Sequence, residues 1–273
     1  METALIGGVM NGPELEGRTA LVTGASSGIG HATAVALCRS GADVVATARN
    51  REGIEAVAEE IRAFGGRTRA IASDVSLPDD VDSLFDEAGS VDILINCAGV
   101  IQPIAPVSGS DRDAWLENIK INLYGPYLTC RRALPSMMEK GWGRIVNVTA
   151  GVASGRMASW SAYSAAKAGV ETLTKVMARE VGNSGVRVNA IRPGIVDTRM
   201  QEEIRGSDEV FFGRENLERY RSYKERGMLR RPEDPARLIL WLLTPEADDL
   251  NGEVLVIDDP EVAARLGLEP MGR

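Results

Sequence analysis

Seven short runs of apolar, largely β-branched residues recur along this chain of 273 residues, and helical segments lie between them. Strands that are apolar along almost their whole length are buried on both faces, as in a parallel sheet covered by helices. The runs are TALVTG (19–24), DVVATA (43–48), TRAIASDV (68–75), VDILINCAG (91–99), GRIVNVTA (143–150), VRVNAIRPG (186–194) and GEVLVID (252–258). We therefore predict an α/β fold: a single-domain, doubly wound sheet of about seven parallel strands with helices on both faces.

Two segments fall outside this alternation. Residues 1–14 are expected to form a flexible N-terminal arm, which leaves residues 15–273 as the folded domain. Residues 198–231 connect the sixth strand to the helical sequence PEDPARLILWLL. Connections of that length are usually functional or contain small helices, so we expect this segment to be a substrate lid.

Charge and composition argue against several classes of function. The formal net charge of −8 disfavours nucleic acid or an anionic membrane as a partner, and no apolar run is long enough to span a membrane. The three cysteines form no CxxC pair and His31 is the single histidine, so we expect no disulfide framework and no metal site. The start of the chain lacks the pattern of a signal peptide. We expect a soluble, cytoplasmic protein.

The sequence TGASSGIG (23–30) follows the first predicted strand and opens a helix. Glycines at positions 24, 28 and 30 allow a sharp turn and a close approach of the backbone to a pyrophosphate, which then lies at the helix N-terminus. Such a triplet can also be an ordinary tight turn. Its position after the first strand of a βαβ unit favours a dinucleotide site.

The end of the second predicted strand indicates which dinucleotide. An acidic residue here would hold the 2′-hydroxyl of NAD, but the chain has Ala48 followed by Arg49. Without the carboxylate a 2′-phosphate is not repelled, and a guanidinium can bind it through two hydrogen bonds. Arg49 could also be a solvated surface charge. We expect NADP(H) to be preferred, with NAD(H) possible.

Tyr163 and Lys167 lie four residues apart at the start of a predicted helix, which places them on the same face. A nearby ammonium favours the phenolate form of tyrosine, and this would lower the tyrosine pKa toward the pH at which acid–base catalysis operates. The pair follows the strand next to the predicted dinucleotide crevice, where ligands bind in sheets of this kind.

These motifs together resemble the short-chain dehydrogenase/reductase family, and the resemblance extends from about Arg18 to Asp258. The matching pieces, in order, are TGASSGIG, Asp74-Val75, NCAG (96–99), Asn122 in KINLYGPY, YSAAK (163–167) and RPG (192–194). The family implies a Rossmann-like domain that transfers hydride between a nicotinamide and a carbonyl or alcohol.

The resemblance also implies roles for individual residues. Tyr163 would donate or accept the proton, Lys167 would bind the nicotinamide ribose and lower the tyrosine pKa, and Asn122 would hold a proton-relaying water. Asp74 would contact the adenine, and residues 96–99 would brace the cofactor and the sheet. The implied cofactor-binding residues are Gly24, Ser26, Ser27, Gly28, Ile29, Gly30, Arg49, Asp74, Val75, Asn96, Ala98, Gly99, Tyr163, Lys167, Pro193, Gly194, Val196 and Thr198.

One position departs from the family in a way that affects catalysis. The family has a serine thirteen residues before the tyrosine, which donates a hydrogen bond to the reacting oxygen, and this chain has Ala150 there. Thr149 could supply the hydroxyl, although strand alternation points it to the opposite face. A serine of the following loop, at position 154, 159 or 161, could also turn inward. The third alternative is that the donor is absent, so that the enzyme is slow or uses a substrate with its own polar group.

The loops after the fourth, fifth and sixth strands would bind the substrate. Their candidate substrate residues, most of them apolar, are Ile101, Ala150, Met157, Trp160 and Met200. The last strand ends in VIDDPE (256–261), where the family usually has two glycines after an aspartate. This difference is expected to alter the C-terminal turn.

The sequence therefore predicts an NADP(H)-preferring oxidoreductase for a small to medium, mainly apolar ketone or secondary alcohol. Its catalytic residues would be Tyr163, Lys167 and Asn122, with Thr149 as a candidate donor. The alternative is a dinucleotide-binding protein with weak or no turnover, acting as a sensor or an inactive subunit. The family resemblance also implies a homotetramer or a dimer.

Overall fold

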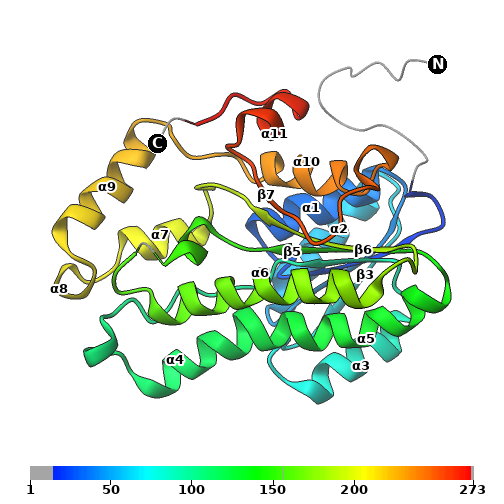
Figure 1. Cartoon of the computed structure of the whole chain (residues 1–273), viewed down its shortest axis with the longest axis horizontal. Helices are drawn as coiled ribbons and strands as arrows, with labels where there is room; N and C mark the ends of the chain where they lie inside the picture. Colours follow the sequence, from blue (N-terminus) through cyan, green and yellow to red (C-terminus); the bar gives the residue numbers. More distant parts are fainter. Residues whose placement is uncertain (1–14, 156, 272–273) are drawn as a thin grey trace.

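The strands form one parallel sheet in the order β3-β2-β1-β4-β5-β6-β7 (Figure 1). The computed structural model describes residues 15–155 and 157–271. The strand bounds are β1 Thr19–Thr23, β2 Asp43–Ala48, β3 Thr68–Ala72, β4 Ile93–Asn96, β5 Gly143–Val148, β6 Val186–Arg192 and β7 Val254–Val256. The chain builds outward from β1 to β3, returns to β4 beside β1, and then builds outward in the other direction. This order confirms the predicted doubly wound sheet and places its switch point between β1 and β4.

Helices cover both faces of the sheet because successive strand residues point to opposite sides. On one face, Ala20 and Val22 pack in a cluster with side chains from α1, α2 and α10. On the other face, Leu21 packs in a cluster with side chains from α3, α5 and α6. The helices of these two layers are α1 Gly28–Arg39, α2 Arg51–Ala63, α3 Pro78–Ala88, α5 Gly125–Glu139, α6 Ser161–Val181 and α10 Glu233–Trp241.

The remaining helices are short, and several lie near the carboxyl edge of the sheet. They are η2 Val107–Gly109, α4 Arg112–Ile119, the π-helical turn η3 Lys120–Tyr124, η4 Gly151–Ser154, α7 Arg199–Arg205, α8 Glu209–Phe212, α9 Arg214–Glu225, η5 Pro245–Ala247 and α11 Pro260–Arg265. The connection predicted as a lid thus contains three helices, α7 to α9. No helix in the described ranges is long and apolar enough to cross a membrane. The predicted arm, residues 1–14, lies outside these ranges.

Six of the seven predicted strands are shorter in the structure than their apolar runs. The fourth, for example, begins at Ile93 and ends at Asn96, although its apolar run covers residues 91–99. After β1, β4, β5 and β6 the backbone leaves the sheet before the end of the quoted sequence run. The residues that follow these strands form loops at one edge of the sheet. These loops hold most of the candidate site.

The altered C-terminal sequence has a structural role. Asp258 accepts hydrogen bonds from the buried Arg230 at 2.9 Å and 2.6 Å, which ties the end of the lid segment to the end of β7. Asp259 caps α11 by accepting from Glu261 N at 3.0 Å. The acidic pair therefore fixes the lid segment and starts an additional helix.

Candidate active site

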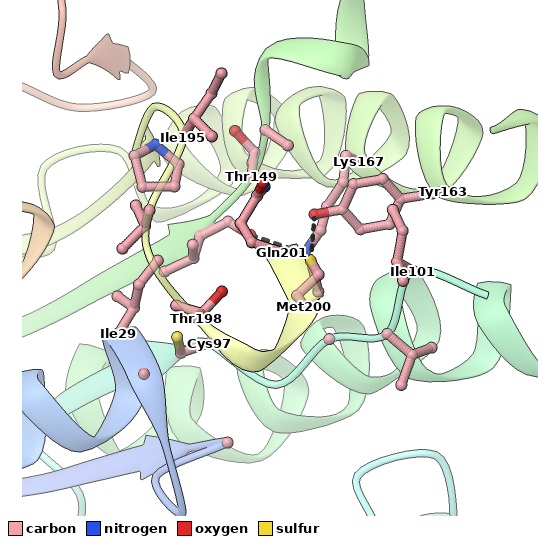
Figure 2. A pocket seen from close by; sticks show the side chains of 18 of the residues that line it. Ile29, Cys97, Ile101, Thr149, Tyr163, Lys167, Ile195, Thr198, Met200 and Gln201 are labelled. Carbon is pink, nitrogen blue, oxygen red and sulfur yellow. Dashed lines mark hydrogen bonds between the residues drawn. The ribbon is translucent and has the colours of Figure 1, made fainter. Parts of the chain in front are cut away.

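A cavity of about 1260 Å³ lies at the carboxyl ends of the strands, and the loops after β1, β4, β5 and β6 contribute to its wall (Figure 2). Residues of α7 and α9 line it from the lid side. Ligands of doubly wound sheets bind at this edge, beside the switch point. The cavity is somewhat larger than the 300 to roughly 1,000 Å³ typical of a pocket for one ligand, and its lining extends from the glycine turn to Tyr163.

The glycine turn forms one end of this cavity. Gly24 has φ +66°, and a Cβ there would lie 2.7 Å from Ala98 Cα. Gly28 begins α1 with φ +56°, and its Cβ would lie 2.9 Å from Thr198 Cγ2. A side chain at Gly24 would collide with the loop after β4, and one at Gly28 would collide with Thr198 in front of α1. The turn therefore fits a bound pyrophosphate.

A threonine that the sequence analysis did not select fixes the approach of β4 to this turn. The hydroxyl of Thr23 accepts hydrogen bonds from Cys97 N and Ala98 N, both at 3.1 Å. This contact brings the loop after β4 against the glycine turn. Thr23 is the first residue of TGASSGIG, but the role of its side chain was not predicted from that motif.

Arg49 and Asp74 lie together at the far end of the cavity. The Arg49 guanidinium is 3.7 Å from Asp74 Oδ2, and both residues line the cavity. Asp74 also accepts from Ser76 N at 2.9 Å and Ser76 Oγ at 2.7 Å. Arg49 is largely exposed, so its charge is free to reach a ligand that enters beside β2.

Most of the predicted cofactor residues line the cavity, but Gly30 and Asn96 do not. A Cβ at Gly30 would lie 2.3 Å from Gly24 O, so this glycine permits the packing of the turn on itself. Asn96 is buried, donates to Asn147 Oδ1 at 2.9 Å and accepts from Thr129 Oγ1 at 2.7 Å. Asn96 therefore braces β4 against β5 and α5, as expected for the sheet, and its contact with the cofactor stays a prediction.

Tyr163 and Lys167 are one turn apart on α6, and both side chains face the cavity (Figure 2). The Tyr163 hydroxyl lies 3.8 Å from Met200 Sδ. The Lys167 ammonium donates to Val148 O at 2.9 Å and lies 5.6 Å from the centre of the Tyr163 ring. The predicted juxtaposition of phenol and ammonium is present.

Burial sets the pKa values of this pair. Removal from water raises the pKa of Tyr163 and lowers the pKa of Lys167 to about 8. The expected lowering of the Tyr163 pKa by Lys167 is not found, because the cost of burying a phenolate outweighs any attraction to the ammonium. Tyr163 is therefore held in the protonated form, which is the form that donates a proton.

Asn122 lies in the π-helical turn between α4 and α5, a kind of turn that is frequent at functional sites. Its amide donates to Val100 O and to Asn118 Oδ1, each at 2.8 Å. A Cβ at Gly99 would lie 2.8 Å from Asn122 Oδ1 and 3.6 Å from Lys167 Nζ. Gly99 therefore lets the asparagine and the lysine converge, although Asn122 itself does not line the cavity. The water that it would hold remains a prediction.

The hydroxyls considered as substitutes at Ala150 either donate to other acceptors or, as for Ser161, do not line the cavity. The buried Thr149 hydroxyl lies 3.1 Å from Glu171 Oε1 and 3.0 Å from Ile191 O. Ser154 donates to Gly151 O, Ser159 donates to Phe211 O, and Ser161 accepts from Trp115 Nε1. The structure does not support Thr149 as the catalytic donor, because Glu171 and the end of β6 bind its hydroxyl.

The candidate substrate residues Ile101, Ala150, Met157, Trp160 and Met200 all line the cavity. Trp160 stacks on Phe212 of α8, with ring centres 5.4 Å apart, and meets the Tyr163 ring edge-on at 6.2 Å. This aromatic contact packs the lid segment against the start of α6. The sequence analysis missed Gln201 and Tyr220 as lining residues, because nothing in a helical run shows which side chain faces a cavity.

A glycine turn at the switch point and a buried tyrosine–lysine pair facing the same cavity define a dinucleotide-dependent oxidoreductase. The family model described as short chain dehydrogenase matches residues 18–209, and the chain belongs to this family. It is an NAD(P)-dependent oxidoreductase of the class that acts on alcohols and ketones.

Named relatives agree with this assignment. The chain is 38% identical over 245 residues to cis-4-hydroxycyclohexanecarboxylate dehydrogenase of Sinomonas cyclohexanicum, covering 88% of this chain and 95% of that protein. The fold also matches a solved structure designated an NAD(P)-dependent gluconate 5-dehydrogenase from Beutenbergia cavernae, which contains NADP at low occupancy. The TM-score is 0.80 and the sequence identity is 32%, and the match covers 92% of this chain and 99% of that one. The 3-ketoacyl-(acyl-carrier-protein) reductase of Brucella melitensis, solved with NADH, has a TM-score of 0.77 and 30% identity over 89% and 97%.

Proposed function

We propose that the protein is an NADP(H)-preferring oxidoreductase for a small to medium, mainly apolar ketone or secondary alcohol, with Tyr163 as proton donor or acceptor. The observation that carries the proposal is the Tyr163 hydroxyl in a largely apolar part of the cavity, with Lys167 one helical turn away. A bound nicotinamide would supply or accept the hydride.

The protein's own residues would handle the proton. Burial keeps Tyr163 protonated, so it can donate to a carbonyl oxygen during reduction. As the proton leaves, negative charge grows on the phenol, and the neighbouring ammonium of Lys167 stabilises it. Asn122, which shares the space beside Gly99 with Lys167, would support proton exchange at the lysine.

Preference for NADP(H) is supported by the cavity end at β2. Ala48 offers no carboxylate to bind a ribose 2′-hydroxyl, and the exposed Arg49 can bind a 2′-phosphate. Asp74 already lies near this guanidinium, so binding of the phosphate would compete with an existing ion pair.

Ala150 supports a second candidate function. The methyl group cannot donate a hydrogen bond to the reacting oxygen, and the nearby hydroxyls have other partners. Loss of one such donor typically lowers the rate about 10²–10³-fold. The second candidate is therefore a dinucleotide-binding protein with weak or no turnover.

Two measurements distinguish the candidates. NADPH binding is followed by fluorescence, and NADPH oxidation is followed by absorbance with a panel of diverse ketones. Oxidation that disappears in Tyr163→Phe, but persists in the control Tyr127→Phe at an exposed position of α5, supports the enzyme. Tight binding with no oxidation across the panel supports the second candidate. Failure to bind either dinucleotide would contradict both.

We also propose a homo-oligomer, a tetramer or a dimer, formed through the helices around Asn122 and Tyr163. The outer sides of α4 to α6 expose large apolar side chains, which are Leu116, Tyr124, Tyr127, Met138 and Val176. Light scattering on the purified protein measures the mass directly. A monomer at all concentrations would contradict this part of the proposal.

A further inference from the structure

Gln201 is a buried amide without a hydrogen-bond partner for its side-chain oxygen. The residue lies on α7 and is 9% exposed, and its Oε1 has no partner among the described residues. Each of the other buried amide side chains in these ranges has at least one hydrogen bond. Those residues are Asn96, Asn118, Asn122, Asn147 and Asn189.

Gln201 lies at the proposed substrate end of the cavity. Gln201 lines the cavity, and its neighbour Met200 places Sδ 3.8 Å from the Tyr163 hydroxyl (Figure 2). Ile204, one turn further along α7, packs in the apolar cluster that contains Trp160 and Tyr163. Arg199 and Glu203 of α7 also line the cavity, and Gln201 is the buried polar residue of this helix next to Met200.

A buried amide oxygen without a partner lowers stability, because it has lost its hydrogen bonds to water and gained none in return. The indole N–H of Trp160, another residue of the cavity wall, also has no partner in the described part of the chain. Unpaired polar atoms of this kind in a native protein require an explanation, and a ligand that bonds to them provides one. An amide oxygen accepts hydrogen bonds, so the unpaired Oε1 can bind a hydroxyl.

We propose that Gln201 determines substrate specificity by hydrogen bonding to a second oxygen function of the substrate, apart from the carbonyl or alcohol that reacts. The substrate class is then a ketone or secondary alcohol with an apolar body and one further hydroxyl group. This inference rests on the proposed function and makes it more specific. It also explains how a substrate can be held without the donor missing at Ala150.

The test measures equilibrium binding of ketone pairs that differ by one hydroxyl. Suitable pairs are butanone with 4-hydroxy-2-butanone and acetophenone with 4-hydroxyacetophenone, because neither added hydroxyl is a secondary alcohol that the oxidised dinucleotide could oxidise. Each is titrated into the protein saturated with oxidised dinucleotide, a complex that cannot reduce the ketone. We expect the wild-type protein to bind the hydroxylated member of at least one pair about tenfold more tightly, the worth of one hydrogen bond to a buried partner.

The variant Gln201→Met keeps the length of the side chain and removes the amide. We expect it to lose the tenfold preference, to retain its affinity for the plain ketone, and to bind NADPH as tightly as the wild-type protein. The control is Gln102→Met, which changes the other glutamine of the chain; its side-chain oxygen already accepts from Ile104 N at 3.1 Å. This control should still bind the hydroxylated ketone about tenfold more tightly than the plain one.

Thermal unfolding separates a recognition role from a structural one. Because the Gln201 oxygen makes no hydrogen bond, Gln201→Met should melt at the same temperature as the wild-type protein or higher. A large fall in melting temperature would show that the amide stabilises the fold and would overturn the proposal. The proposal would also be overturned if the wild-type protein bound both members of every pair equally well. It would likewise be overturned if Gln201→Met bound NADPH more weakly but still preferred the hydroxylated ketone.

The binding test does not depend on turnover. If Gln201→Met removes the preference for the hydroxylated ketone and no NADPH oxidation is observed, recognition by Gln201 is supported and the proposed enzyme activity is contradicted. NADPH oxidation without any preference within the pairs would support the enzyme and contradict the role of Gln201.

Discussion

The carboxylate of Glu171 on α6 binds the guanidinium of Arg192 at the end of β6 through two hydrogen bonds of 2.7 Å each. Glu171 Oε1 also lies 3.1 Å from the Thr149 hydroxyl, just after β5. One carboxylate thus connects a helix to the ends of two neighbouring strands. Because Arg192 and Thr149 line the cavity, this contact positions part of its wall.

Glu171→Ala should lower the free energy of unfolding by about 2 kcal/mol, because it leaves a partly buried guanidinium without its partner. Urea unfolding measures the loss. The double variant Glu171→Ala/Arg192→Ala should lose less than the sum of the two single variants, since it leaves no unpaired charge. Additive losses would show that the two side chains are not coupled.

The stability contributed by Lys167 should depend on pH. Its pKa is about 8 in the folded protein and near its ordinary value of 10.5 in the unfolded chain. Between these values the unfolded state binds more protons, so the free energy of unfolding should rise with pH. Comparison with Lys167→Met isolates this group. The free energy of unfolding of the wild-type protein minus that of the variant should rise from pH 8 to 10. The raised pKa of Tyr163 acts in the opposite direction only above about pH 10, where an unfolded tyrosine ionises. A difference that stays constant up to pH 10 would contradict the lowered lysine pKa.

Ala150→Ser should raise the turnover number on a generic ketone by about 10²-fold, because it restores a donor to the reacting oxygen. The measurement is steady-state NADPH oxidation. Thr149→Val is the matched control: it should lower stability by about 1 kcal/mol through loss of its hydrogen bonds and leave turnover unchanged. Loss of turnover in Thr149→Val would mean that Thr149 serves as the donor after all.

Arg49→Ala should weaken NADPH binding at least tenfold and leave NADH binding nearly unchanged, because only NADPH carries the 2′-phosphate. Fluorescence titration gives both dissociation constants. Arg51→Ala removes an exposed arginine two residues later, at the first position of α2, and should have little effect on either. Equal effects on NADPH and NADH would exclude Arg49 as the residue that selects the phosphate.

Local patterns in the sequence predicted the sheet, the glycine turn and the tyrosine–lysine pair. Strand burial produces continuous apolar runs, and helical periodicity places Tyr163 and Lys167 on one face whatever surrounds them. The runs extend past the observed strands, because pattern alone does not show where the backbone leaves the sheet. Asn96 shows the same limit, since its motif predicts a position near the cofactor and not the side chains that it contacts.

The sequence by itself therefore determined the order of the strands and helices, the family, and the spacing of the proposed acid–base pair. The tertiary structure alone decided that burial raises the pKa of Tyr163, that Glu171 binds both Arg192 and Thr149, and that Gln201 lines the cavity with an unpaired oxygen. Periodicity and spacing depend on neighbours along the chain, which a sequence displays. Desolvation and hydrogen bonding depend on neighbours in space, and these exist only after the helices have packed on the sheet.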